Sequence, residues 1–219
     1  MKLVNIKIYK KIIYSVFLFI IVSYVKVNAQ ENMRIKNKPG GIFSLGVRAP
    51  ISAFNDGDWR NFGTGAGGQF RIRLAERLST DWFFDYVTGN VSDFANRTDY
   101  HIGWSVVYYL GKESPDLRGI QPYVLAGHCF DYTNQKDNLN KNNFAERWSS
   151  AVQAGLGTHF NLTKRFDVST TLQYMIHMGT DIHADKHDGV VVFEKESGVN
   201  LEGHLFFNLS LNYKIVDLW

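Results

Sequence analysis

Cysteine and proline are scarce in this sequence. Cys129 is the single cysteine among 219 residues, and only four residues are proline. One cysteine cannot form a disulfide within the chain, so an exported disulfide scaffold is excluded. No Pro- or Ser-rich stretch separates two parts of the chain, and no heptad pattern is sustained. We therefore expect one folded domain.

Positive charge is also scarce once the first thirty residues are set aside. The chain has 24 Lys and Arg against 21 Asp and Glu, but five of the lysines and none of the acids precede residue 30. The remaining 19 basic and 21 acidic residues give a net charge of −2. A nucleic-acid partner is therefore not expected.

The first 29 residues have the pattern of a secretory signal. A lysine-rich start is followed by the apolar run Ile12–Val25 and by Val27-Asn28-Ala29, which ends on a small residue. The alternative is a retained membrane helix, but the run of 14 residues is shorter than the roughly 20 that a spanning helix needs. We expect a signal peptide over 1–29, a short periplasmic tether over 30–40 and one folded domain over 41–219.

Apolar residues alternate with small or polar residues throughout the expected domain. The clearest example is 100–110, where Tyr, Ile, Trp, Val, Tyr and Leu occupy every second position. Alternation with a period of two is typical of a strand with two unlike faces. Eight such runs occur, at 43–49, 69–74, 78–86, 100–110, 123–130, 152–160, 166–177 and 204–215, and we expect eight strands of roughly nine to twelve residues.

The connections between these runs alternate in length. Short ones, at 75–77, 111–119 and 161–164, alternate with long ones. This is typical of an up-and-down barrel with short turns in the periplasm and long loops outside the cell. The expected extracellular loops are 50–64, 89–98, 131–148 and 178–200.

The polarity of the two faces distinguishes a membrane barrel from a soluble, lipocalin-like one. The aromatic and branched face is nearly continuous in all eight runs, while the other face mixes Gly, Ser, His, Asn, Gln, Asp and Arg. An eight-stranded barrel has little interior space, which could hardly hold roughly forty large apolar side chains. We expect an all-β, eight-stranded antiparallel transmembrane barrel with its apolar face in outer-membrane lipid.

Charged residues on the polar face need partners inside such a barrel. Arg71 and Arg73 lie across a tight turn from Asp81 and Asp85, within the reach of neighbouring strands. A polar pore lining or a catalytic carboxylate pair would use the same residues, but a plugged core that satisfies buried charges is favoured. The expected interior network comprises Arg71, Arg73, Asp81, Asp85, Gln153, His159, Asp167 and Gln173.

Two local motifs accompany this plan. Gln121-Pro122-Tyr123-Val124-Leu125-Ala126-Gly127 resembles the Pro-Tyr-x-x-x-Gly strand of the small OmpA-like and OmpX-like barrels, the outer membrane protein β-barrel domain family. Tyr213, Ile215 and Trp219 resemble the C-terminal signal that the barrel-assembly machinery reads, although Asp217 departs from its alternation. The resemblance implies fold and location; it does not imply an activity, because such folds carry many functions.

Three functions remain open from the sequence. The first is a non-catalytic barrel with a structural or accessory role, contacting other envelope proteins through its loops or its lipid-facing wall. The second is a small pore, which Phe83, Tyr109, Phe130 and Phe206 would narrow if they point inward. The third is a lipid-modifying enzyme like the lipid A deacylases, but their outward His-x-Ser pair is missing. We expect no enzyme and no cofactor.

The stretch 177–191 is rich in histidine and aspartate. His183 and His187 have the spacing of a His-Glu-x-x-His zinc protease, but the Glu is replaced by Ala184 and glycines bracket the stretch. We expect His177 to close the seventh strand with its side chain inward. The rest is expected to be a solvated extracellular loop that could bind a partner or, weakly, a metal ion through Asp181, His183, Asp185, His187 and Asp188.

Overall fold

A computed structural model describes residues 40–54, 61–91, 93–111, 119–179, 181–196 and 203–219. The expected signal peptide and nearly all of the tether lie outside these residues. The described part contains ten strands, and none of its residues belongs to a helix that could cross a bilayer.

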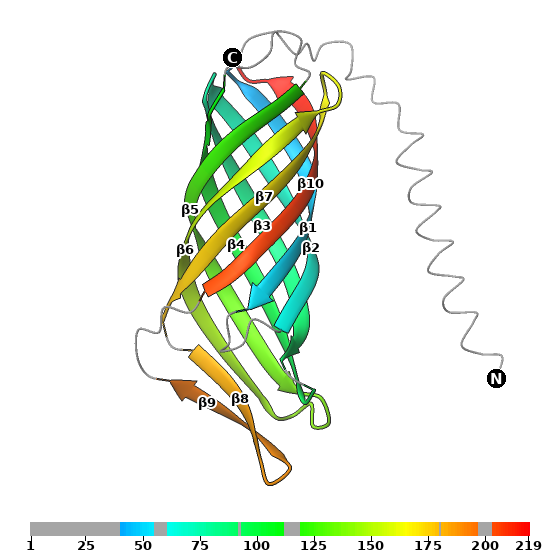
Figure 1. Cartoon of the computed structure of the whole chain (residues 1–219), viewed down its shortest axis with the longest axis vertical. Coiled ribbons are helices and arrows are strands. Elements are labelled where there is room, and N and C mark those ends of the chain that lie inside the picture. The colour runs from blue at the N-terminus through cyan, green and yellow to red at the C-terminus, as the bar shows by residue number, and fades with distance from the viewer. Residues whose placement is uncertain (1–39, 55–60, 92, 112–118, 180, 197–202) are drawn as a thin grey trace, which may run out of the picture. The chain divides into compact units, whose positions relative to one another are not determined.

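Eight of the strands close into an antiparallel barrel in the order β1-β10-β7-β6-β5-β4-β3-β2 (Figure 1). Every neighbouring pair except the closing pair β1–β10 is consecutive among the eight, which confirms the predicted all-β, eight-stranded fold. The remaining two strands, β8 and β9, form a separate hairpin. The barrel strands are β1 Ile42–Phe54, β2 Asn61–Ala75, β3 Leu78–Val91, β4 Ala95–Tyr109, β5 Gly119–Asp137, β6 Phe144–Asn161, β7 Phe166–Met178 and β10 Gly203–Asp217; the hairpin strands are β8 Asp181–His187 and β9 Val190–Glu196.

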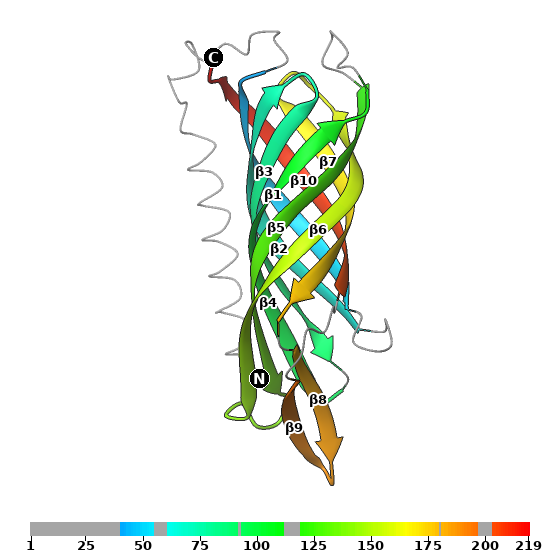
Figure 2. The same cartoon turned by 90° about the vertical axis from the view of Figure 1, so that its left-hand side faces the viewer.

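The two ends of the barrel differ. One end, here the terminal end, holds the C-terminus and the connections 76–77, 110–118 and 162–165, and the other, the loop end, holds β8–β9. At the loop end β5 and β6 continue beyond the end of β7 (Figure 2). Ser150 is the first β6 residue that pairs with β7, whereas β6 pairs with β5 from Phe144 onward.

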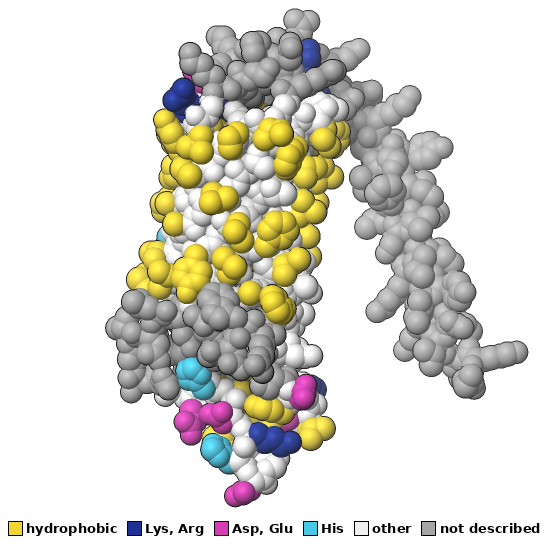
Figure 3. Space-filling model, viewed as in Figure 1, with side chains coloured by type: hydrophobic (Ala, Val, Ile, Leu, Met, Phe, Trp, Pro, Cys, Tyr) yellow, Lys and Arg dark blue, Asp and Glu magenta, His cyan; other side chains and the backbone are white. Residues whose placement is uncertain are grey.

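Apolar side chains cover the outside of the barrel, as Figure 3 shows for one face. Toward the loop end this surface finishes in a row of four cross-strand partners, Tyr86, Tyr100, Tyr132 and Trp148. Adjacent rings in the row lie 4.9 to 6.0 Å apart. Beyond the row, the outward positions of β4, β5 and β6 include the polar residues Asn96, Asn134 and Glu146. An aromatic row between apolar and polar surface is typical of the edge of a membrane.

The strands are longer than the sequence predicted, and the loops are shorter. Barrel strands run from 13 to 19 residues, and the connections are 55–60, 92–94, 138–143 and 179–202. The expected loops 50–64, 89–98 and 131–148 are therefore mostly strand. The expected loop 178–200 contains the hairpin β8–β9. The prediction was wrong because it ended each strand where outward apolar residues stop, whereas backbone pairing continues past the lipid edge.

A β-bulge accounts for the irregular C-terminus. Phe43 pairs with Val216 and Ser44 with Lys214, so Ile215 is an extra residue on β10. The bulge reverses the alternation that follows it. Asp217 therefore pairs with the buried Ile42 and does not stand in the lipid-facing row.

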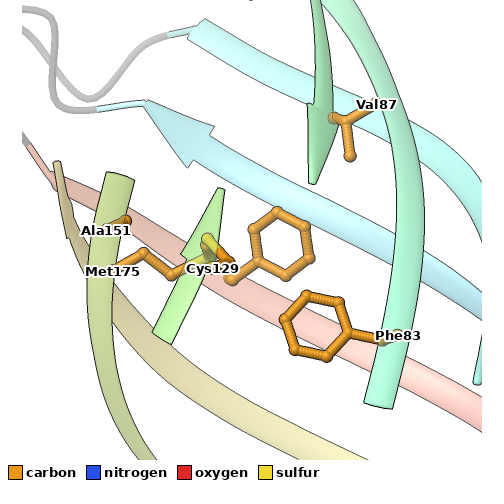
Figure 4. Close-up of a cluster of buried hydrophobic side chains, with 6 residues drawn as sticks. Phe83, Val87, Cys129, Ala151 and Met175 are labelled. Atoms are coloured by element: carbon orange, nitrogen blue, oxygen red, sulfur yellow. The ribbon is translucent and has the colours of Figure 1, made fainter. Parts of the chain in front are cut away.

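Two small apolar clusters lie inside the barrel. One contains Phe83, Val87, Cys129, Ala151, Met175 and Phe206 (Figure 4), and the other contains Val107, Tyr109, Tyr123 and Leu125. Phe130, which we expected inside, is 61% exposed on the outer wall. That prediction was wrong because both faces of β5 are apolar near Phe130, so alternation alone does not show which face is inward.

Candidate functional site: the filled interior and the loop end

The terminal half of the interior contains an ion-pair network centred on Arg71. Its guanidinium donates from Nε and Nη2 to both carboxylate oxygens of Asp81, at 2.7 and 3.0 Å, and lies 3.3 Å from Asp167. Arg71 and Asp81 are direct cross-strand partners on β2 and β3. Asn212 donates to Asp167 at 2.8 Å. Charged side chains in a filled barrel are thus neutralised by partners from several strands.

Arg73 and His159 are buried beside this network, and the Ser169 hydroxyl contacts both Arg71, at 3.4 Å, and His159. Arg73 donates to Gln121 at 3.2 Å and covers the Tyr109 ring at 4.3 Å. The Nδ1 and Nε2 atoms of His159 lie 2.6 Å from the Ser169 hydroxyl and 3.2 Å from the Tyr109 hydroxyl.

A separate group, in the middle of the barrel, joins two glutamines. Gln173 donates to Gln153 at 3.0 Å, and Gln153 donates to the Ser105 hydroxyl at 2.8 Å.

Asp85 pairs with a residue that the sequence did not single out. It lies opposite Gly67 and forms an ion pair with Arg48 of β1 at 2.9 Å. Arg48 also donates to Gln69 at 2.9 Å and lies 4.5 Å from the centre of the Phe83 ring. Arg48 occupies one of the alternate positions of β1 that face the interior, so the alternation of that strand could have identified it as an interior residue.

These groups leave little open space at the terminal end. The described residues there enclose a cavity of about 20 Å³, lined by Arg71, Arg73, Tyr109 and His159 among others. Such a volume has room for about one water molecule. Side chains fill this end of the interior.

Three buried histidines, His101 of β4, His177 of β7 and His204 of β10, gather inside the loop end; we call them the histidine cluster. Among the described residues, only this group brings three His, Cys or carboxylate ligand atoms within 4.8 Å of one another. The His177 and His204 rings lie 4.4 Å apart. The sequence predicted that His177 points inward, and His177 is buried in the structure. The sequence did not predict that the three histidines meet.

The carboxylate of Asp131 lies between two of these rings. Its Oδ1 is 3.2 Å from His101 Nε2, and its Oδ2 is 3.1 Å from His177 Nδ1. Asp131 is the direct cross-strand partner of His101. Arg97 contacts Nε2 of His204 at 3.1 Å and is itself held by both oxygens of Asp99.

Ser149, His177 and Asp131 resemble a catalytic triad in composition but not in geometry. The Ser149 hydroxyl is 3.4 Å from His177 Nδ1, the same nitrogen that Asp131 contacts. A triad needs serine and carboxylate on opposite nitrogens of the imidazole, so that one orients the ring while the other loses its proton. This group therefore does not form a hydrolase site.

The five expected loop residues lie on β8 and the turn after it. His183, Asp185 and His187 share one parity on β8, which spaces successive members about 6.8 Å apart. These residues are not among the described groups of three whose ligand atoms lie within 4.8 Å of one another. Asp188, with a φ of 48°, begins the turn to β9. A weak metal site here stays a prediction.

A groove of about 750 Å³ lies between the start of β6 and β9. Asn143 links its two walls by donating to the Val191 carbonyl at 2.7 Å. Its lining residues are Asn143, Phe144, Ala145, Glu146, Val191, Val192, Phe193 and Lys195. Close by, the backbone N–H of Leu139 holds the pKa of the Asp137 carboxyl below its ordinary value and stabilises the 138–143 turn.

Comparison with known proteins supports the fold. No protein-family model and no curated protein matches this chain. Two solved structures match with a TM-score of 0.53: Neisserial surface protein A, at 12% identity over 80% of this chain and 96% of that one, and a major outer membrane protein of Thermus thermophilus, at 10% identity over 79% and 99%. The N-terminal barrel of Pseudomonas aeruginosa OprF matches at 0.45, with 15% identity over 78% and 96%.

This is the fold of the small outer-membrane barrels. The expected resemblance is thereby confirmed for the fold. Sequence identities of 10 to 12% do not show that the function is shared.

The expected assembly signal lies at the terminal end of this barrel. Tyr213 packs against Phe166 with ring centres 4.9 Å apart and accepts a hydrogen bond from Arg165 at 3.0 Å. Ile215 is the bulge residue, and Trp219 is 56% exposed. Recognition of these residues by the assembly machinery stays a prediction.

Proposed function

We propose that this protein is a non-catalytic outer-membrane barrel, exported through its signal peptide, that binds another envelope protein through the groove between β6 and β9. In this arrangement the terminal end faces the periplasm and the loop end is extracellular. The filled interior supports a role that does not involve conduction. The absence of triad geometry around Ser149 supports a role without acyl transfer.

The observation that carries the proposal is a pair of strand edges at the groove. Residues Phe144 to Ser149 of β6 pair with β5 alone, and β9 pairs with β8 alone among the described strands. Unpaired edges present backbone N–H and C=O groups to any extended chain that fits beside them. The partner that this chemistry suits is an extended segment of another polypeptide, added as a strand.

Apolar side chains beside these edges add to the proposal. Phe144 is 50% exposed and Val192 is 37% exposed, and both line the groove beyond the aromatic row that marks the lipid edge. Water, not lipid, would cover them there, and burying them against a partner would recover the hydrophobic free energy. Glu146 and Lys195 supply one charge of each sign in the same groove.

Site-specific photocrosslinking in whole cells tests this proposal. A photoreactive amino acid replaces Phe144 or Val192 in the groove, and Val190, which is 63% exposed but lies outside the groove, serves as the matched control. We expect one distinct protein adduct from Phe144 and Val192 and none from Val190. Equal adducts from all three positions, or a product of twice the chain mass, which would indicate a second copy of the chain, contradict the proposal.

Replacing 181–196 by a short Gly-Ser linker gives a second test. The barrel closes through pairing of β7 with β10, so the shortened protein should still fold, as a shift in gel mobility on heating would verify. The Phe144 adduct should disappear, because one wall of the groove is gone. An unchanged adduct in the shortened protein would place the partner elsewhere.

A further inference from the structure

We propose that the histidine cluster binds one divalent transition-metal ion, such as Zn²⁺, inside the loop end of the barrel. The three imidazoles come from different strands, and their ligand atoms lie within 4.8 Å of one another. Imidazole nitrogens bind Zn²⁺ at about 2.0–2.1 Å, so the rings need to move inward by only about 1 Å. This site is independent of the groove and of its partner.

Asp131 prepares two of the rings for a metal. One oxygen of this carboxylate faces His101 Nε2 and the other faces His177 Nδ1. The His177 contact requires a proton on Nδ1, which leaves Nε2 with a free lone pair, whereas the His101 contact is not a hydrogen bond and leaves Nδ1 of that ring able to act as a ligand. A carboxylate that orients a metal-binding histidine in this way is a common feature of zinc sites.

The two nitrogens that this arrangement leaves free point to a ligand. Both histidine side chains are at most 1% exposed, and neither His101 Nδ1 nor His177 Nε2 has a hydrogen-bond partner among the described residues. A buried polar atom without a partner costs roughly 1–3 kcal/mol. A metal ion would satisfy both atoms at once and would also supply positive charge beside the buried Asp131 carboxylate.

His204 is the third ligand and the weakest. Arg97 contacts its Nε2 at 3.1 Å and so competes for the ring. Asp99 holds Arg97 with both carboxylate oxygens, at 3.1 and 3.0 Å, and the charges of this pair offset each other. Loss of His204 should therefore reduce metal affinity less than loss of His101 or His177.

Metal titration of the refolded, tag-free protein tests the site. After treatment with a chelator, Zn²⁺ is added in a calorimeter and Co²⁺ is added with visible spectroscopy as a probe of coordination. We expect one ion per chain and the absorption bands of Co²⁺ held by nitrogen ligands. No binding of either ion by folded wild-type protein would overturn the proposal and would leave a protonated histidine paired with Asp131 as the account of the cluster.

Variants locate the ion. His101→Gln and His177→Gln should abolish measurable binding, and the milder Asp131→Asn should weaken it about 10- to 100-fold. His159→Gln is the buried control, because both nitrogens of that ring already have partners. The double variant His183→Gln/His187→Gln is the surface control. Binding that the surface variant removes and the interior variants keep would assign the ion to β8 and overturn the proposal.

A spectroscopic readout covers the case in which an interior histidine variant does not fold. Addition of Zn²⁺ to wild-type protein labelled on its histidine nitrogens should shift the ring ¹⁵N signals of three residues. Asp131→Asn, which changes no ligand, assigns the signals of His101 and His177. Shifts confined to exposed histidines would contradict the interior site.

Discussion

At the scale of single residues, charged side chains of the interior form ion pairs with residues of the same strand, a neighbouring strand or a more distant strand. Arg71 is the clearest case, because it contacts Asp81 and Asp167 from one guanidinium. Removing one partner of a buried ion pair is costly, since the remaining charge loses its compensation. Two buried carboxylates depend on Arg71.

Arg71→Met should therefore lower the free energy of unfolding by about 3–5 kcal/mol. Urea unfolding of the refolded barrel in detergent, followed by tryptophan fluorescence, measures the change. Arg77→Met is the matched control: Arg77 lies in the exposed turn six positions away, and its loss should change stability by less than about 0.5 kcal/mol. Equal effects of the two substitutions would show that the interior pair contributes little.

The sequence predicted these inward residues through alternation, and it failed where alternation is ambiguous. Arg71, Asp81, Gln153 and His159 stand opposite large apolar neighbours, so the inward face was evident. Phe130 stands on a strand that is apolar on both sides. The meeting of His101, His177 and His204 could not be predicted, because it depends on the register of strands that are far apart in the sequence.

At the scale of strands, apolar alternation marks the lipid edge and not the strand end. β4 continues from Tyr100 to Ala95 and β5 from Tyr132 to Asp137 with polar residues on the outside, while every backbone pair between them is kept. Polar outward residues are favourable there because water has replaced lipid. The predicted loops were therefore too long at the first three loop-end connections.

The bulge on β10 gives a test at the same scale. Deleting Ile215 removes the extra residue and keeps every pair with β1, so the protein should refold with a yield near that of the wild type. Deleting Tyr213 also removes one residue, but it places Lys214 on the lipid-facing row, so refolding should fail or fall sharply. The fraction that changes gel mobility on heating reports the yield. The reverse ranking would show that Ile215 is a regular ladder residue.

At the scale of the whole molecule, the account requires the apolar wall to lie in lipid. Trp82 and Trp104 are cross-strand partners on that wall, and Trp148 belongs to the aromatic row at its edge. In vesicles containing lipids brominated near the bilayer centre, variants that retain only Trp82 or only Trp104 should be quenched strongly. A variant that retains only Trp148 should be quenched weakly. Equal weak quenching of all three would indicate a barrel that does not insert.

A measurement of ion conduction distinguishes a filled barrel that binds a partner at its loop end from a pore. The interior contains the polar networks described above, two apolar clusters and the histidine cluster, and the cavity at its terminal end has room for about one water molecule. The most direct measurement is single-channel recording of the purified protein in a planar bilayer, with insertion verified by its resistance to protease. We predict a quiet baseline at all applied voltages. Steady openings of one reproducible unit conductance would contradict the filled interior and would support the hypothesis that the protein is a pore.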